Sequence, residues 1–337
     1  MTFKRAILFC SRRYNFLGLN NSKFNTSHRI ETSREDLVRS KVKLYLDLIR
    51  LKRPFGVLFT VTPGIFSLAM AAPAGSFPDP WLMLKFAIGA FLVRSSACVI
   101  NDALDKSFDA HVLRTANRPM AKNLISMKEA VILTTIMMMF AFCILLSFRS
   151  KICLIQGILC VPLMILYPLF KRFTYFTSVM LGITTSVGAF MGWSATNFDI
   201  APSITIPLFL GCVAWAVFYD SIYGAQDMKY DQKINVKSLA IFLTKHKIEK
   251  LFLGGVVASC VVFWLISGYN SDQTWPYYLS LAGISAYFTW VIQRLDLYNT
   301  KTLPKIFISN TILPPILTLG IIASTKLKPK FIHKTKT

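Results

Sequence analysis

The 337-residue chain is both strongly apolar and strongly basic: hydrophobic residues make up 54%, charged residues only 16%, and the formal net charge is +22. A soluble domain contains about a quarter charged residues, so this composition excludes a large soluble domain and predicts a polytopic membrane protein. Lysine and arginine lie between apolar stretches and form no stripe interleaved with aromatic residues, which argues against nucleic-acid binding.

The first thirty residues differ from the rest of the chain. They contain six basic residues (Lys4, Arg5, Arg12, Arg13, Lys23 and Arg29), and no acid precedes Glu31. A basic, acid-free segment that can form a short amphipathic helix is typical of a mitochondrial transit peptide. We therefore predict a transit peptide and a basic N-terminal segment in residues 1–35; the alternative is an ordinary basic cytosolic tail.

Nine apolar stretches follow, each close to the roughly 20 residues that a membrane-spanning helix needs. They cover residues 54–72, 81–101, 128–148, 151–168, 174–196, 204–222, 250–268, 274–292 and 305–325. Pro54, Pro80 and Pro304 stand at the start of three of them, where proline is tolerated. These stretches predict an all-α bundle of about nine transmembrane helices.

The connections between these stretches differ in charge. Those after the second, fourth, sixth and eighth stretches are rich in lysine and arginine, whereas the alternate connections hold only Arg149 and Lys151. The positive-inside rule therefore places the basic connections on one membrane face. The basic tail, residues 326–337, disagrees, because nine crossings place it on the opposite face.

The scarce acids gather where two predicted helices end on the basic face. In "NDALDKSFD", Asn101, Asp105 and Asp109 follow one another at intervals of four, and Asp102 precedes Asp105 by three. Residues at these intervals share one face of a helix. In "DSIYGAQDMKYD", Asp227 and Asp231 repeat the interval of four. Four predicted crossings separate the two groups, so both are expected on the same face of the membrane.

Carboxylates at this spacing repel one another, so a cation is expected between them. Oxygen ligands without histidine or cysteine suit Mg²⁺, which takes one or two carboxylates together with waters and substrate phosphates. Basic side chains near the acids could neutralise the remaining charge of a diphosphate. The candidates are Lys106, Arg114, Arg118, Lys171 and Arg172.

These residues carry a resemblance to a known family. "NDALDKSFD" resembles the N-D-x-x-D-x-x-x-D motif of the UbiA superfamily of intramembrane prenyltransferases, and "DMKYD" resembles its second motif, D-x-x-x-D. The stretches "RLKRPFG", "RTANRP", "YPLFKR", "GWSA", "YDSIYGAQD", "VKS" and "FISN" are similar to the branch that prenylates 4-hydroxybenzoate. The resemblance covers residues 45–325, nearly the whole chain after the predicted transit peptide.

The resemblance implies nine transmembrane helices around a central cavity, and an enzyme of the mitochondrial inner membrane with its site on the matrix side. The implied reaction joins a polyprenyl diphosphate to 4-hydroxybenzoate, ortho to the hydroxyl, in ubiquinone synthesis. Its implied cofactor is Mg²⁺, its surroundings are membrane lipid, and association with other ubiquinone-synthesis proteins is expected.

Carried over by position, the resemblance assigns Mg²⁺–diphosphate binding and catalysis to the two acidic groups, Asn101, Asp102, Asp105, Asp109, Asp227 and Asp231. It assigns the diphosphate charge balance to the five basic candidates above. Arg50 or Arg53 would hold the carboxylate of the acceptor. Two positions depart from the family pattern: Tyr230 replaces a common acid, and Lys106 stands where arginine is frequent.

Two alternatives are open at this point. The same fold could use another acceptor, either haem or a naphthoquinone precursor. A transporter is an alternative of a different class, since acids within membranes also mark ion paths. Its acids would be expected near the middle of the membrane, whereas these cluster at one face.

Overall fold

The computed structural model describes residues 34–329 except 53–54, 113, 171 and 234–236. The chain divides into two units, residues 1–41 and 42–337. Of the first unit only the beginning of helix α2 (Arg34–Leu48) is described, so the predicted transit peptide lies almost wholly outside the described residues. The helices of the second unit are described below.

Every regular element among the described residues is helical, which confirms the predicted all-α class. After α2 the order is α3 (Phe55–Ala71), α4 (Pro80–Leu104), α5 (Lys106–Asp109), α6 (Met127–Leu146), α7 (Lys151–Phe170), α8 (Thr177–Ser186), α9 (Gly188–Asn197), α10 (Pro202–Ala225), α11 (Met228–Lys233), α12 (Leu239–His246), α13 (Glu249–Asn270), α14 (Trp275–Arg294), α15 (Leu303–Ser309), the 3₁₀ turn η1 (Asn310–Ile312) and α16 (Leu313–Leu327).

Each of the nine predicted stretches coincides with helix, but the count of nine crossings is not confirmed. Among the described residues, six helices are long and apolar enough to cross a membrane: Pro80–Leu104, Met127–Leu146, Lys151–Phe170, Pro202–Ala225, Glu249–Asn270 and Leu303–Leu327. Phe55–Ala71 is apolar but shorter. The stretch predicted at 174–196 is two helices, α8 and α9, which are separated at Val187.

Local sequence signals explain where several helices begin. Asp79 caps α4 by accepting a hydrogen bond from the backbone N–H of Trp81 at 2.7 Å, and Pro80 occupies the first turn. Ser126 and Glu129 form a reciprocal capping box at the start of α6. Both devices satisfy backbone donors that a helix start leaves without partners.

Small residues allow the central helices to approach closely. In α9, a Cβ added to Gly192 would lie 2.8 Å from the backbone nitrogen of Leu68 in α3 and even closer to the backbone oxygen of Gly64. Only glycine fits where two helix backbones come this near. At the far end of α3, Thr325 of α16 donates a hydrogen bond to the Ala69 carbonyl at 3.2 Å. These contacts hold α9 and α16 against α3.

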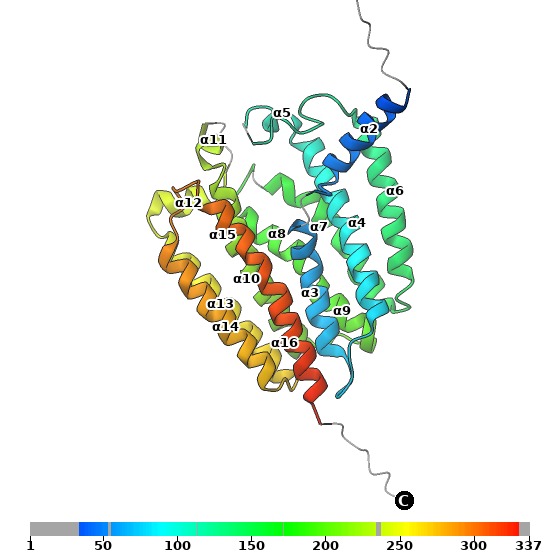
Figure 1. Ribbon diagram of the computed structural model, residues 1–337, viewed down its shortest axis with the longest axis vertical. Helices are drawn as coiled ribbons and strands as arrows, with labels where there is room; N and C mark the ends of the chain where they lie inside the picture. The colour runs from blue at the N-terminus through cyan, green and yellow to red at the C-terminus, as the bar shows by residue number, and fades with distance from the viewer. Residues whose placement is uncertain (1–33, 53–54, 113, 171, 234–236, 330–337) are drawn as a thin grey trace, which may run out of the picture. The chain divides into compact units, whose positions relative to one another are not determined.

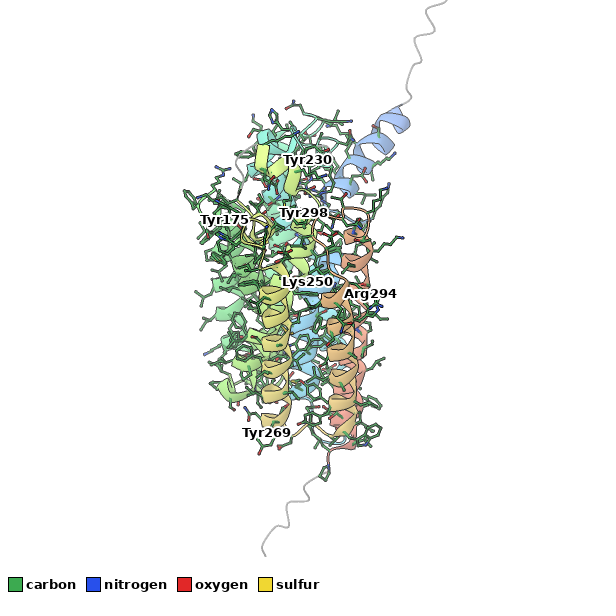
Figure 2. All side chains as sticks on the ribbon, turned by 90° about the vertical axis from the view of Figure 1, so that its left-hand side faces the viewer. Tyr175, Tyr230, Lys250, Tyr269, Arg294 and Tyr298 are labelled. Carbon is green, nitrogen blue, oxygen red and sulfur yellow. The ribbon has the colours of Figure 1, made fainter. Side chains whose placement is uncertain are left out.

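The helix ends define two opposite ends of this bundle. Figure 1 shows α5, α11 and α12 at one end of the long helices, beside the C-terminal ends of α4 and α10. In Figure 2, Lys250 and Arg294 lie toward this end of α13 and α14, and Tyr269 lies at the other. The described start of the basic tail lies at that other end, because Lys328 donates to the carbonyl of Ser271 at 2.5 Å. The described start of the basic tail, residues 326–329, therefore lies at the end of the bundle opposite the acidic groups.

Candidate active site

The first acidic group lies where α4 passes into α5. Asp105 directly follows Leu104, the last residue of α4, and its backbone N–H donates to the Asn101 carbonyl at 2.9 Å. The N–H of Asp109 in turn donates to the Asp105 carbonyl at 2.8 Å. The intervals of four residues therefore carry helix-type backbone hydrogen bonds, although α4 ends before Asp105 and α5 begins after it. Asp102 and Asp105 are each only 1% exposed.

The second acidic group lies where α10 passes into α11. Asp227 follows the end of α10, and its carbonyl accepts from the N–H of Asp231 at 3.0 Å. Both groups line a single polar cavity of about 280 Å³. The structure thus brings together two groups that are more than one hundred residues apart, as the shared membrane face predicted.

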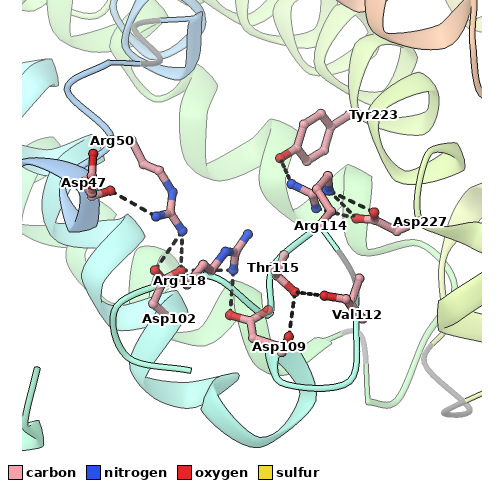
Figure 3. A network of polar contacts seen from close by, with 10 residues as sticks. All are labelled: Asp47, Arg50, Asp102, Asp109, Val112, Arg114, Thr115, Arg118, Tyr223 and Asp227. Atoms are coloured by element: carbon pink, nitrogen blue, oxygen red, sulfur yellow. Dashed lines mark hydrogen bonds and ion pairs between the residues drawn. The ribbon is translucent and has the colours of Figure 1, made fainter. Parts of the chain in front are cut away.

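Arg118 and Arg50 neutralise the first group (Figure 3). The Arg50 guanidinium donates to both oxygens of Asp102, at 2.6 and 2.7 Å. Arg118 bridges two acids, with its Nη1 3.0 Å from Asp102 and 2.7 Å from Asp109. Buried carboxylates need such partners, because isolated charges are costly away from water.

Arg114 neutralises the second group. Its Nε lies 2.8 and 2.9 Å from the two oxygens of Asp227, and its Nη2 also contacts this carboxylate. Its Nη1 donates to the hydroxyl of Tyr223 at 2.6 Å, and the guanidinium lies 4.8 Å from the centre of that ring (Figure 3). Arg114 belongs to the connection after α5, so it ties this connection to α10.

The surroundings of both loop arginines favour their charged forms. Burial lowers the pKa of Arg114, but hydrogen bonds to Asp227 and the field of Tyr223 outweigh it, so the pKa is raised. Burial likewise lowers the pKa of Arg118, and the charges of Asp102 and Asp109 outweigh it, so this pKa is also raised. Two permanent cations therefore stand at the cavity, each paired with acids of one group.

The remaining predicted cations are not placed on the wall of this cavity. Arg172 donates to the Leu104 carbonyl at 3.2 Å and lies 5.5 Å from the centre of the Phe108 ring. Lys106 is half-buried in α5 and does not line the cavity. Lys171 and Arg53 lie outside the described residues. Of the basic residues that the sequence analysis expected to bind the diphosphate, the structure brings Arg114 and Arg118 to the acidic groups.

The donor set fits Mg²⁺, which coordinates carboxylate and amide oxygens. Among the described residues, no group of three acidic, histidine or cysteine side chains is close enough to hold a metal ion by itself. This agrees with an ion that takes one or two protein carboxylates and completes its shell with phosphate and water. Asn101, Asp105 and Asp231 line the same cavity and add oxygen donors of that kind.

Sequence reasoning missed Arg94 of α4. It precedes Asn101 by seven residues, which is about two helical turns, so the two residues share one face. Arg94 lines the polar cavity, a lateral cavity and an apolar cavity. Its guanidinium forms no hydrogen bond or ion pair with any other residue that the structure describes. An arginine inside an apolar span was the signal that could have found it.

Gly56 leaves the space that Arg94 occupies. A Cβ at Gly56 would lie 2.6 Å from the Arg94 Nε and 2.9 Å from its Nη2. The close approach explains why "RLKRPFG" ends in glycine at this point.

The apolar cavity encloses about 180 Å³ and shares Arg94, Tyr167 and Leu181 with the polar one. It extends between α4, α6, α7 and α9 to Lys85 and Phe148, near the opposite end of α4. The walls are almost wholly apolar, so this cavity suits a hydrocarbon chain whose polar head lies at the acids.

The lateral cavity, about 340 Å³, lies between α3, α10 and α15. Aromatic rings form part of its wall: Phe59 stacks on Tyr219 at 4.3 Å, and Phe307 lies 4.9 Å from Tyr223. Arg94, Arg114 and Asp220 line it as well. An aromatic wall with a cation suits a small aromatic anion and also stabilises a positively charged intermediate.

Residues 57–312, which hold both acidic groups, match the UbiA prenyltransferase family. The chain belongs to this family. Proteins named 4-hydroxybenzoate polyprenyltransferase, mitochondrial, are similar over most of their length. The Caenorhabditis elegans protein is 39% identical, with 86% of this chain and 81% of that protein covered. The human protein is 37% identical, with 87% and 78% covered.

Solved UbiA structures share the fold. A UbiA homologue from Aeropyrum pernix K1 superposes with a TM-score of 0.67 at 20% identity, covering 79% of this chain and 97% of that one. A homologue from Archaeoglobus fulgidus, solved with GPP and Mg²⁺ bound, gives a TM-score of 0.65 at 15% identity, with 84% and 100% covered. The helical arrangement described above is therefore the UbiA fold.

Proposed function

We propose that this UbiA-family chain transfers a polyprenyl group from a polyprenyl diphosphate to 4-hydroxybenzoate, at the ring carbon ortho to the hydroxyl. The reaction is a step of ubiquinone synthesis and depends on Mg²⁺. The observation that carries the proposal is the meeting of both acidic groups and two arginines at the mouth of an apolar cavity. The names of the similar mitochondrial proteins supply the acceptor.

The residues that would hold Mg²⁺ are Asn101, Asp102, Asp105, Asp109, Asp227 and Asp231, with one or two of their carboxylates on each ion. When bound, the ion neutralises the diphosphate and stabilises it as a leaving group. Arg114 and Arg118 neutralise further phosphate charge, because their guanidinium groups offer several N–H donors at the cavity wall. Lys106 and Arg172 do not line the polar cavity, so we assign them a longer-range electrostatic contribution to the charge balance, together with Lys171 of the same sequence pattern.

The prenyl chain lies in the apolar cavity, whose lining is almost wholly apolar. Departure of diphosphate leaves an allylic cation, which aromatic rings stabilise and water would quench. Phe59, Tyr219 and Phe307 offer such rings beside the polar cavity. The ring carbon of the acceptor then attacks the first carbon of the prenyl cation.

Arg94, and not Arg50, holds the acceptor carboxylate; Arg53, the other residue expected for this role, lies outside the described residues. Arg50 is already engaged with both oxygens of Asp102. Arg94 lines all three cavities, has no carboxylate partner among the described residues and lies beside aromatic walls. An arginine without a counter-ion in a low-dielectric site favours an anionic ligand strongly.

We place the protein in the mitochondrial inner membrane, with the acidic end of the bundle toward the matrix, in association with other ubiquinone-synthesis proteins. The support is the predicted basic N-terminal segment, the excess of lysine and arginine at the connections of that end, and the mitochondrial names of the relatives.

The test is product formation by the full chain in liposomes. The chain is incubated with 4-hydroxybenzoate, a polyprenyl diphosphate and Mg²⁺, and the product is identified by mass. We expect prenylated 4-hydroxybenzoate, its loss with EDTA, and its loss in Asp227→Ala. Haem and a hydroxynaphthoate are supplied in parallel. A product with one of these and none with 4-hydroxybenzoate would overturn the acceptor, and equal activity in Asp227→Ala would overturn the site.

A further inference from the structure

Asp220 is an acid at the site for which the proposed function above has no role. It lies in α10, seven residues before Asp227, which follows the end of that helix, and both residues line the polar cavity. It lines both the polar cavity and the lateral cavity, as Arg94 does. Its carboxylate is thus presented to the space where a prenyl cation and an aromatic acceptor would meet.

The partners of Asp220 differ from those of the ion-paired acids. Asp102, Asp109 and Asp227 each bind an arginine guanidinium. Asp220 instead accepts a hydrogen bond from the hydroxyl of Ser178 at 2.6 Å, through Oδ2. Among the described residues it forms no ion pair, and no donor bonds its Oδ1. The charge of Arg94 acts on it through space.

This arrangement leaves one carboxylate oxygen oriented by Ser178 and another able to take a proton. A base in a dry site needs such a lone pair close to the reacting atom, with its rotamer fixed by a neighbour. Tyr219 and Tyr223 also line the lateral cavity, but a neutral phenol is a poor proton acceptor. Asp102, Asp109 and Asp227 are held by arginine and would share their oxygens with Mg²⁺.

We infer that Asp220 is the catalytic residue that removes the ring proton after the new carbon–carbon bond has formed. The bond between the prenyl carbon and the diphosphate oxygen breaks first, and the electron pair leaves with diphosphate. The acceptor carbon then supplies two electrons to the prenyl carbon, which gives a cationic ring. Asp220 takes the proton from that carbon, and the electrons of the carbon–hydrogen bond restore aromaticity. The carboxyl group finally returns the proton to water.

The alternative base for removal of the ring proton is the released diphosphate. An experiment can distinguish it from Asp220. The inference rests on the proposed function, because it needs an aromatic acceptor in the lateral cavity. The variants are Asp220→Asn, which is isosteric and can still accept from Ser178, and Asp220→Glu. The control is Asp79→Asn, an exposed acid at the other end of α4 whose capping role asparagine also fills.

Three measurements are made on the full chain in liposomes. The first is Mg²⁺-dependent binding of geranyl S-thiolodiphosphate, which cannot ionise readily. The second is exchange of ¹⁸O between bridging and non-bridging positions of geranyl diphosphate, which reports ionisation. The third is the rate of prenyl transfer to 4-hydroxybenzoate with hydrogen or deuterium at both positions ortho to the hydroxyl.

For Asp220→Asn we expect the affinity for the analogue and the rate of ¹⁸O exchange to stay within about threefold of the wild-type values. The rate of prenyl transfer should fall by about 10²-fold or more. We expect Asp220→Glu to show a deuterium isotope effect larger than that of the unchanged chain, because proton removal becomes slower. Asp79→Asn should match the unchanged chain in all three.

Two results would overturn the inference. Transfer by Asp220→Asn within about threefold of the unchanged chain would assign proton removal to diphosphate or another group. Loss of analogue binding in parallel with activity would assign Asp220 to the metal or diphosphate instead. Failure of the unchanged chain to prenylate 4-hydroxybenzoate would overturn the proposed acceptor, and the three measurements would then be repeated with whichever acceptor yields product.

Discussion

Arg114 and Asp227 are 113 residues apart in the chain, yet the Arg114 Nε lies within 2.9 Å of both oxygens of the Asp227 carboxylate. Tyr223, one turn earlier in α10, receives another N–H of the same guanidinium. This three-residue contact fixes the connection after α5 to the end of α10. It also holds a cation beside the polar cavity, where a diphosphate would need one.

The planar guanidinium geometry of Arg114 should therefore contribute to activity as well as its charge. Arg114→Lys keeps one positive charge but cannot contact Asp227 and Tyr223 together. We expect kcat/KM for the polyprenyl diphosphate to fall about 10- to 100-fold, as loss of one or two charge-assisted hydrogen bonds implies. The matched control is Arg294→Lys, at the exposed end of α14. Equal kinetics in both variants would contradict the role of the guanidinium geometry.

Arg94 should determine acceptor specificity by binding the carboxylate of the acceptor. In Arg94→Gln we expect kcat/KM for 4-hydroxybenzoate to fall about 30-fold or more, since loss of a partner in a buried charge pair costs about 2 kcal/mol or more. Phenol lacks the carboxylate, so its slower prenylation should be almost equal in the unchanged chain and in Arg94→Gln. If both substrates lose the same factor in the variant, Arg94 does not bind the carboxylate.

Gly56 should affect binding of the acceptor, because it leaves space for the Arg94 side chain. Gly56→Ala places a methyl group 2.6 Å from the Arg94 Nε, so the guanidinium must shift. We expect KM for 4-hydroxybenzoate to rise about tenfold, or about 1.4 kcal/mol, with KM for the diphosphate unchanged. In Gly255→Ala, where no atom lies within 4 Å of an added Cβ, neither constant should change. A change in both constants would indicate a general distortion of α3.

Gly192 should matter for stability. A methyl group there meets the backbone of α3, including the Leu68 nitrogen at 2.8 Å, and backbone cannot rotate away as a side chain can. We expect Gly192→Ala to destabilise the fold by about 1–3 kcal/mol, and to lower the midpoint of thermal unfolding in detergent. Gly283→Ala, which has open space, is the control and should be neutral or slightly stabilising. An unchanged midpoint for Gly192→Ala would mean that α9 and α3 separate without cost.

Sequence alone determined the features that depend on spacing along one helix. Apolar length predicted where the helices lie, because a bilayer sets the number of residues that a span needs. The interval of four predicted that Asn101, Asp105 and Asp109 share a face, and their backbone hydrogen bonds keep that spacing where α4 ends and α5 begins. Charge at the connections predicted that both acidic groups meet at one end of the bundle. The UbiA resemblance rested on the same local motifs.

Tertiary structure alone decided which partner each charged group has, because pairing across helices depends on their rotation and packing. Arg50 precedes the first apolar stretch and Arg94 lies inside the second, and neither position reveals a partner: Arg50 binds Asp102, whereas Arg94 lines three cavities. Arg172 and Arg118 each follow an apolar span, yet Arg172 contacts the Leu104 carbonyl and Arg118 bridges two acids. Asp220 and Asp227 line the same polar cavity, but only Asp227 forms an ion pair with an arginine, because the loop that carries Arg114 reaches the end of α10.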